Sequence, residues 1–252
     1  MLLNTSTWPE VEAYLERCKG IIIPIGSFEQ HGPNGLVGTD AICPEIIAHE
    51  AGQESGFLVG PTFNVGIAQH HLAFPGSMTL RPSTMIAAMN DWIASLVRHG
   101  FDRIYFFNGH GGNITTVNAA FAEYYANYSL DDAPCPVRLA QQNWWELPGV
   151  MATCKKLFPV GEGAHATASE VSVTQYAYPD AIKRVEMDPK IAPNGRFTDA
   201  ADYRATFPDG RIASDPSQAT PEAGAEIVSI AKQALIAELS IFFETKLEAA
   251  AE

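Results

Sequence analysis

The chain has 252 residues, of which 46% are apolar and 18% charged, so it can bury a large core and is too apolar to be disordered. Its net charge of -13 argues against a nucleic-acid partner and against docking on an anionic membrane, because both need a basic surface. There is no signal-peptide pattern and no apolar run of about 18 residues, and the four cysteines are scattered. We therefore expect a cytoplasmic protein with reduced thiols.

Short β-branched or aromatic runs alternate along the chain with longer segments of helical spacing. We expect strands over residues 20–27, 57–64, 103–109 and 136–143. We expect helices over residues 40–56, 81–100, 113–129 and 221–250, the second of them capped by Ser83 or Thr84. This alternation predicts an α/β fold in which helices cover both faces of a mostly parallel sheet.

No linker and no internal repeat divides the sequence, so we expect a single domain over residues 1–252. Residues 180–220 are irregular and rich in Pro, Asp and Gly. A segment of this length and composition is typical of an excursion near an active site or of a subunit contact.

Carboxylates and imidazoles gather just after two of the predicted strands and at the start of a later helical pattern. Because ligands collect at the carboxyl ends of parallel strands, we expect these side chains to converge at one edge of the sheet. The candidates are Glu29, His31, Asp40, His110, His165 and Glu170.

A metal site would explain why these charged groups follow buried strands, where they are costly to desolvate. The charges of two divalent ions would be balanced by Glu29, Asp40 and Glu170 together with one hydroxide. Nitrogen and oxygen ligands without cysteine suit zinc, manganese or iron. Paired ions activate water and polarise a carbonyl group, which amide hydrolysis requires.

Other interpretations of the same residues stay open at this point. Asp40 is also placed to cap the helix that follows it, and a single His at a strand end is commonly a hydrogen-bonded structural residue. The stretch "GHGG" is also typical of a phosphate-binding turn, although it lacks the GxGxxG spacing and the Walker lysine. Glu162 is expected to be a solvated loop carboxylate.

Five stretches, taken together, resemble the creatininase (creatinine amidohydrolase) family. They are "GSFEQHGPNGLVGTD", "AFPGSMTL", "FNGHGGN", "HATASEVSVT" and "FPDGRIASDPSQATPEAG", in this order along the chain. The resemblance implies a three-layer α/β/α sandwich and two divalent ions, with zinc favoured and manganese or iron as alternatives. It also implies a homohexamer that acts on a small-molecule amide.

The resemblance also assigns roles to individual residues. It implies that the metal ligands are Glu29, His31, Asp40, His110 and Glu170, with Asp40 bridging the two ions. It places Glu170 and His165 at the catalytic centre, with His165 as the acid/base residue that protonates the departing nitrogen. The residues expected to contact the substrate are Trp144, Trp145 and His71.

Three positions depart from the family pattern. Gly112 and Gly161 stand where the creatinine-hydrolysing members carry a Glu and a Trp, and Asn34 stands where many relatives have a second His. We therefore expect an amidohydrolase that opens a C–N bond of a small cyclic amide or formamide through a metal-bound hydroxide, with a substrate other than creatinine. The alternatives are a deformylase or peptide-processing hydrolase of a biosynthetic pathway, and a non-catalytic metal- or nucleotide-binding oligomer.

Overall fold

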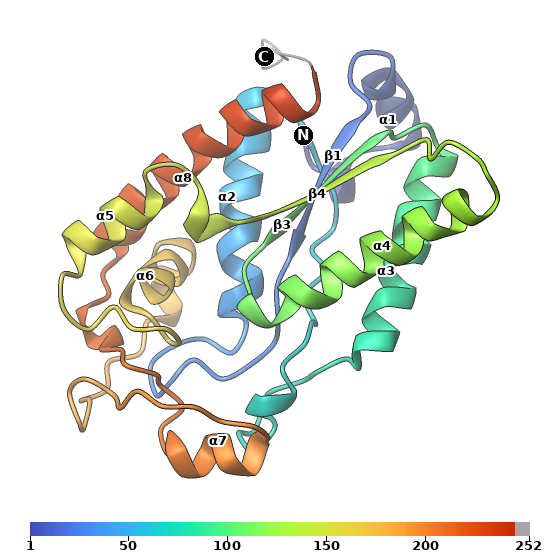
Figure 1. Cartoon of the computed structure of the whole chain (residues 1–252). Coiled ribbons are helices and arrows are strands. Elements are labelled where there is room, and N and C mark those ends of the chain that lie inside the picture. The colour runs from blue at the N-terminus through green and yellow to red at the C-terminus, as the bar shows by residue number, and fades with distance from the viewer. Residues whose placement is uncertain (245–252) are drawn as a thin grey trace.

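A computed structural model describes residues 1–244 (Figure 1). In this part of the chain, four parallel strands form one sheet in the order β2-β1-β3-β4. The strands are β1 (Gly20–Ile25), β2 (Leu58–Val59), β3 (Arg103–Asn108) and β4 (Arg138–Asn143). Because all four run in the same direction, their carboxyl ends lie at a single edge of the sheet.

Helices cover both faces of the sheet, as the sequence predicted. The helices are α1 (Trp8–Leu15), α2 (Thr39–Ser55), α3 (Pro82–Arg98), α4 (Ile114–Leu130), α5 (Val150–Leu157), α6 (Ala168–Ala177), α7 (Ala200–Thr206) and α8 (Pro221–Phe242). In Figure 1, α3 and α4 lie on one side of the sheet, and α2, α5, α6 and α8 lie on the other. The predicted three-layer α/β/α sandwich is confirmed.

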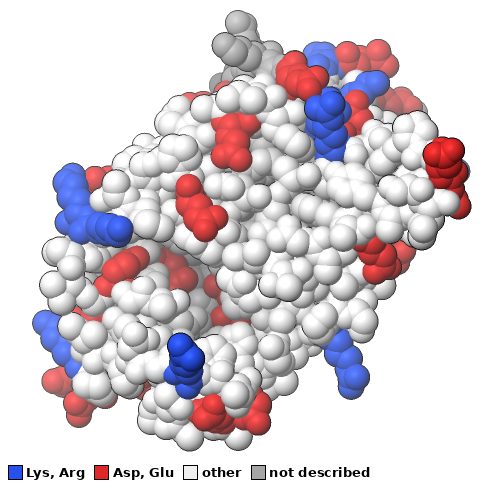
Figure 2. Space-filling view, in the orientation of Figure 1, with Lys and Arg blue, Asp and Glu red and all other residues white. Residues whose placement is uncertain are grey.

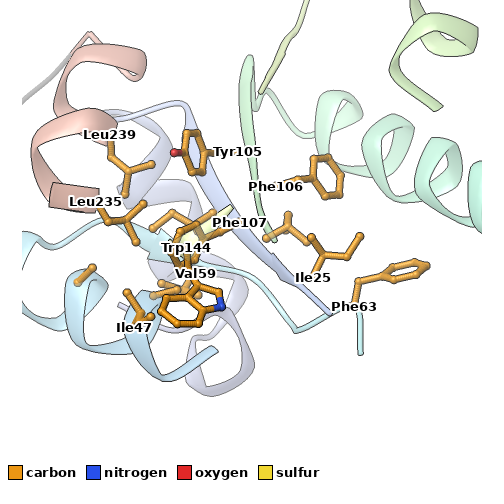
Figure 3. Close-up of a cluster of buried hydrophobic side chains, with 14 of the residues drawn as sticks. Ile25, Ile47, Val59, Phe63, Tyr105, Phe106, Phe107, Trp144, Leu235 and Leu239 are labelled. Atoms are coloured by element: carbon orange, nitrogen blue, oxygen red, sulfur yellow. The ribbon is translucent and has the colours of Figure 1, made fainter. Parts of the chain in front are cut away.

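Alternating side chains of β3 connect the two faces of the core. Tyr105 and Phe107 point toward the α8 side, where Leu235 and Leu239 lie, and Phe106 points toward the opposite side (Figure 3). This follows from strand geometry, in which successive side chains leave opposite faces. All five side chains are buried, and such apolar burial contributes about 25 cal/mol per Å² of surface removed from water.

The register of the strands fixes where functional loops begin. Ile25 at the end of β1 pairs with Asn108 of β3, which in turn pairs with Asn143 of β4. The Asn108 side chain donates a hydrogen bond to the Asn143 side chain across this edge (2.7 Å). The loops after β1 and β3 therefore start side by side.

Several predicted boundaries differ from the structure. The strand predicted over 57–64 is only Leu58–Val59, because Gly60 and Pro61 interrupt the ladder. The cap predicted at Ser83 or Thr84 is wrong: Pro82 is the first residue of α3, where its missing N–H costs nothing, and Arg81 precedes it. Of the helix predicted over 221–250, residues 245–250 lie outside the described residues.

Candidate metal centre

The candidate ligands reach one place from three segments of the chain. The loop after β1 carries Glu29 and His31 and leads directly into α2, whose first turn contains Asp40. His110 follows the end of β3. Glu170 occupies the first turn of α6, where its carboxylate accepts a hydrogen bond from the Thr167 N–H (2.5 Å) in a capping box.

One group consists of Glu29, Asp40 and His110, all of them buried. Nδ1 of His110 lies 3.0 Å from Asp40 Oδ2, and its Nε2 lies 3.4 Å from Glu29 Oε2. The same Nε2 is 2.8 Å from the backbone oxygen of Ile67, which can only accept, so Nε2 carries the proton. In the neutral ring, Nδ1 therefore presents a lone pair beside Asp40.

A second group consists of His31, Asp40 and Glu170. Nε2 of His31 lies 3.1 Å from Asp40 Oδ1 and 3.8 Å from Glu170 Oε2. Nδ1 of His31 lies 3.1 Å from the backbone oxygen of Glu29, so Nδ1 is the donor and Nε2 faces the two carboxylates. Backbone contacts thus aim the lone pairs of both histidines at the one carboxylate that the two groups share, that of Asp40.

The donor set fits a pair of divalent cations. Within each group the candidate ligand atoms lie within 4.8 Å of one another. Both carboxylate oxygens of Glu29 and Oδ2 of Asp40 are buried without a hydrogen-bond partner in the described residues. Buried carboxylate oxygens of this kind are costly unless a cation compensates them. Oxygen and imidazole ligands suit zinc or manganese.

The pKa shifts of these buried groups also show that positive charge stabilises the carboxylates of the site. Burial raises the pKa of Glu29 to about 8, because its charged form lacks solvent. Burial alone would lower the pKa of His31, but the nearby Asp40 and Glu170 carboxylates raise it to about 10. Asp40, placed between two histidines, has its pKa held well below the usual range despite burial. Protons therefore supply the compensating charge in the metal-free chain.

The stretch "NGHGGN" supports the site through its two asparagine side chains. Asn108 donates to the backbone oxygen of His110 (2.7 Å), and Asn113 donates to that of Gly26 (2.9 Å) while accepting from the Ile67 N–H (3.0 Å). Through Asn113 these bonds tie the loop after β3 to the loop after β1 and to the segment after β2. The His110 N–H donates to Asn108 Oδ1 (3.2 Å) and the Asn113 N–H donates to the backbone oxygen of His110 (3.2 Å), so these two backbone donors are already used, which weakens the interpretation of this stretch as a phosphate-binding turn.

His165 lies against the two groups from the segment that precedes α6. Its ring centroid is 4.6 Å from that of His31 and 4.5 Å from that of His71. Nδ1 of His165 is 3.8 Å from Glu29 Oε1, while Nε2 is 2.8 Å from the backbone oxygen of Gln30. Burial, with the neighbouring His31, holds the pKa of His165 well below its ordinary value, so the ring is neutral near pH 7.

A cavity of about 680 Å³ opens onto these residues. Figure 2 shows a hollow on this face with acidic side chains inside it; the cavity's acidic lining residues are Glu29, Asp40, Glu162 and Glu170. Residues 180–220 contribute the cavity-lining side chains Asn194, Phe197, Tyr203 and Ile212. This irregular segment therefore covers the candidate site. A position near an active site was one of the two alternatives expected for it, the other being a subunit contact.

The residues predicted to contact substrate also line this cavity, and that role stays a prediction. Trp144 is buried, and its indole Nε1 has no hydrogen-bond partner in the described residues; Trp145 is half-buried beside it. His71 is buried with its Nε2 3.2 Å from Glu29 Oε1, so it lies against a candidate ligand. Gly112 lines the cavity without offering a carboxylate.

Sequence reasoning missed or misjudged three features of the site. Glu162 is half-buried and accepts a hydrogen bond from the Ser169 N–H (3.2 Å), so the expectation of a solvated loop carboxylate was wrong. Gln30 received no role, although it lies between two candidate ligands in the sequence. Phe197 and Tyr203 come from the irregular segment, where no periodicity could single them out.

Asn34, which stands where many relatives are expected to carry a second His, donates a hydrogen bond from its side chain to the backbone oxygen of Pro216 (3.0 Å).

Two further observations bear on the setting of the site. All four cysteines are free. Among the residues that the structure describes, no helix combines the length and the apolar character needed to cross a membrane.

Comparison with known proteins gives consistent matches over most of the chain. The family model for creatininase, described as creatinine amidohydrolase, matches residues 4–239. Creatinine amidohydrolase of Pseudomonas putida is 26% identical over 191 residues, which cover 70% of this chain and 71% of that protein. The mycofactocin precursor peptide peptidase of Mycolicibacterium smegmatis is 27% identical over 194 residues, covering 73% and 67% of the two chains. A third relative, the 3-dehydro-scyllo-inosose hydrolase of Thermotoga maritima, is 32% identical over 109 residues, 43% of this chain and 35% of that protein.

Solved structures show the same fold. A creatininase variant described as Zn-Zn type superposes with a TM-score of 0.84 at 23% identity, covering 96% of this chain and 98% of that one. A structure described as creatininase Mn gives a TM-score of 0.81 at 24% identity, with the same coverage.

Proposed function

The chain belongs to the creatininase family of hydrolases, and we propose that it is a metal-dependent amidohydrolase that opens a C–N bond of a small cyclic amide or a formamide. The main support is the pair of residue groups that share Asp40. Their buried, unpartnered carboxylate oxygens lie at the floor of a cavity large enough for a small organic substrate.

Each group would hold one divalent ion. The first comprises Glu29, Asp40 and His110, and the second comprises His31, Asp40 and Glu170. When bound, a pair of divalent ions lowers the pKa of water and polarises a carbonyl group. Zinc is the favoured ion, because these oxygen and imidazole donors suit it; manganese and iron are the alternatives.

His165 would carry the proton during the reaction. Its Nε2–H donates to the backbone oxygen of Gln30 (2.8 Å), so the neutral ring keeps its lone pair on Nδ1. Nδ1 faces the Glu29 carboxylate and can take a proton from the attacking water. It can then deliver that proton to the departing nitrogen as the C–N bond breaks, so that the amine leaves neutral.

Two positions favour a substrate other than creatinine. Gly112 lines the cavity without a carboxylate, and Gly161 offers no indole at the position where the creatinine-hydrolysing members are expected to carry one. A second candidate, hydrolysis of a short peptide, is favoured by the volume of about 680 Å³ and by the similarity to a peptide peptidase over 73% of this chain.

The proposal can be tested in two steps. Elemental analysis of protein purified without added metal should give close to two transition-metal ions per chain, and Asp40→Asn should give close to none. Metal-loaded protein should then hydrolyse at least one member of a panel of lactams, formamides and short peptides, with Asp40→Asn as the inactive control. Metal-free protein, or turnover that Asp40→Asn retains, would contradict the proposal. Light scattering on the same samples tests the proposed homohexamer.

A further inference from the structure

Gln30 lies between the candidate ligands Glu29 and His31 in the sequence, and its side chain is buried behind them. The amide nitrogen is 2.9 Å from the backbone oxygen of Gly210 and 3.0 Å from Nδ1 of His71. The amide oxygen accepts a hydrogen bond from the Gly32 N–H (2.8 Å). The function proposed above uses none of these contacts.

The two backbone partners determine which terminal atom of the Gln30 side-chain amide is oxygen and which is nitrogen. The Gly32 N–H can only donate, so the atom facing it must be the oxygen. The Gly210 carbonyl can only accept, so the atom facing it must be the nitrogen. The orientation is therefore set by chemistry that does not depend on any histidine.

The fixed amide determines the tautomer of His71. One amide hydrogen points to Gly210. Nε2 of His165 also lies near the amide nitrogen but is itself a donor to the Gln30 carbonyl oxygen, so the second amide hydrogen is left for Nδ1 of His71, which then accepts. The proton of the neutral ring is left on Nε2, which lies 3.2 Å from Glu29 Oε1. His71 thus places an N–H 3.2 Å from a carboxylate oxygen that has no hydrogen-bond partner among the described residues.

The backbone of the same residue determines the tautomer of His165. Its Nε2 is 2.8 Å from the Gln30 carbonyl oxygen, which can only accept, so Nε2 carries the proton and Nδ1 the lone pair. The Gln30 amide nitrogen also lies 2.9 Å from this Nε2. With both amide hydrogens directed elsewhere, this is a close contact between two donors and not a hydrogen bond.

We propose that Gln30 is a positioning residue, which sets the ring tautomers of His71 and His165 and anchors the 180–220 segment over the site. Through His71 it aims the Glu29 carboxylate, and through Gly210 it holds the covering segment. Gly210 has a φ of +88°, and an added Cβ would overlap the Gln30 amide, so the segment can approach this closely only because residue 210 is glycine. This inference rests on the proposed metal site.

The wild-type protein provides the first test. Long-range proton–nitrogen NMR correlations on protein labelled with ¹⁵N-histidine report which ring nitrogen carries each proton. His71 and His165, assigned through His71→Phe and His165→Asn, should both be Nε2–H tautomers with or without zinc. A proton on Nδ1 of neutral His71 would overturn the proposal, whatever happens to any variant of Gln30.

The second test measures zinc affinity by competition with a chromophoric chelator. Gln30→Met keeps the length of the side chain and removes the amide, so one of the two zinc equivalents should bind roughly 10- to 100-fold more weakly. Gln69→Met makes the same change at an exposed position two residues before His71 and should leave both affinities unchanged.

A double-mutant cycle separates positioning from a general loss of packing. If Gln30 acts on Glu29 through His71, then Gln30→Met should add no further loss of zinc affinity in a His71→Phe background. An equal loss in both backgrounds would refute the route through His71. Wild-type protein that binds zinc but hydrolyses no panel compound would refute the proposed function alone, because the tautomer and zinc measurements need no substrate.

Discussion

Asp40 Oδ2 lies 3.0 Å from His110 Nδ1, the ring nitrogen that is not engaged by the backbone oxygen of Ile67. Burial alone would lower the pKa of His110, but the Glu29 and Asp40 carboxylates raise it to about 9, so in the metal-free chain a proton on Nδ1 supplies the positive charge that a bound cation would supply. The other oxygen of the same carboxylate has an equivalent relationship with His31, at 3.1 Å. Asp40 is therefore the residue on which both candidate metal positions depend.

We first predict that Asp40→Asn abolishes binding of both ions, because it removes the only carboxylate common to the two groups. Glu170→Gln, which alters only the second group, should reduce the stoichiometry from two ions to one. The measurement is elemental analysis after dialysis against metal-buffered solution. Retention of one tightly bound ion by Asp40→Asn would show that Asp40 does not bridge.

We next predict that His165→Ala keeps its metal and loses turnover. His165 belongs to neither group that shares Asp40, and its Nδ1 is 3.8 Å from the nearest Glu29 oxygen. Removal of a general acid/base typically lowers kcat about 10²- to 10⁴-fold. Metal content and kcat are measured on the same preparation. A variant that loses its ions would make His165 a ligand and not a proton carrier.

The convergence of the candidate ligand segments could be predicted because each segment depends on local chemistry. Glu29, His31 and Asp40 follow an apolar strand in a glycine-rich loop, and His110 follows another, so the parallel topology alone brings them to one edge. Their buried surroundings follow from the same topology. The order of strands was not predicted, because nothing in a short apolar run specifies its neighbours.

The rest of the site depends on contacts between distant residues. Glu162 looked solvated because it lies in a glycine-rich loop, yet the fold places it against the first turn of α6. Gln30 contacts Gly210, 180 residues further along the chain. Phe197 and Tyr203 reach the cavity from a segment without periodicity. Local patterns carry no information about such long-range approaches.

Removal of metal should destabilise the fold. The buried carboxylates of Glu29 and Asp40 and the half-buried carboxylate of Glu170 converge here from separate segments, so bound ions would tie the loop after β1 to α2 and α6. Ions present at about 1,000 times their Kd would contribute about 4 kcal/mol, or roughly 8–16 °C in Tm for a domain of this size. Differential scanning calorimetry with and without EDTA measures the shift. The shift should be absent in Asp40→Asn, and an equal shift there would assign it to ions bound elsewhere.

Glu162→Gln should stabilise the metal-free protein more at pH 8 than at pH 5. Burial, reinforced by nearby Glu170, raises the pKa of Glu162 from 4.5 to about 7. The folded state therefore binds this proton more tightly than the unfolded state, so stability falls as pH rises between about 4.5 and 7. Glutamine keeps an oxygen for the Ser169 N–H and has no charge to desolvate.

The expected gain for this variant at pH 8 is about 2 kcal/mol, or roughly 4–8 °C in Tm. Calorimetry in the presence of EDTA at both pH values measures the difference. Glu16→Gln, at an exposed position, controls for the substitution itself and should change Tm little. A gain of the same size at pH 5 and pH 8 would show that removal of the charge is not its cause.

Gly109→Ala should disrupt the candidate metal site by separating the two backbone segments that carry Asp40 and His110. Gly109 follows β3 directly, and a Cβ there would overlap the backbone oxygen of Asp40 and the ring of Pro44 in the first turns of α2. The end of β3 and the start of α2 would have to separate, which moves Asp40 away from His110. Overpacking of this kind typically costs about 1–3 kcal/mol of the free energy of unfolding. The loss in the free energy of zinc binding should be larger than this loss in the free energy of unfolding.

Gly111→Ala is the matched control, since it makes the same change two residues later, where an added Cβ meets nothing within 4 Å. It should keep both the wild-type Tm and the wild-type zinc stoichiometry. Zinc titration and thermal unfolding of the two variants, measured under the same conditions, test this difference between them. If Gly109→Ala binds zinc as tightly as Gly111→Ala, then the close approach of β3 to α2 does not set the distance between Asp40 and His110.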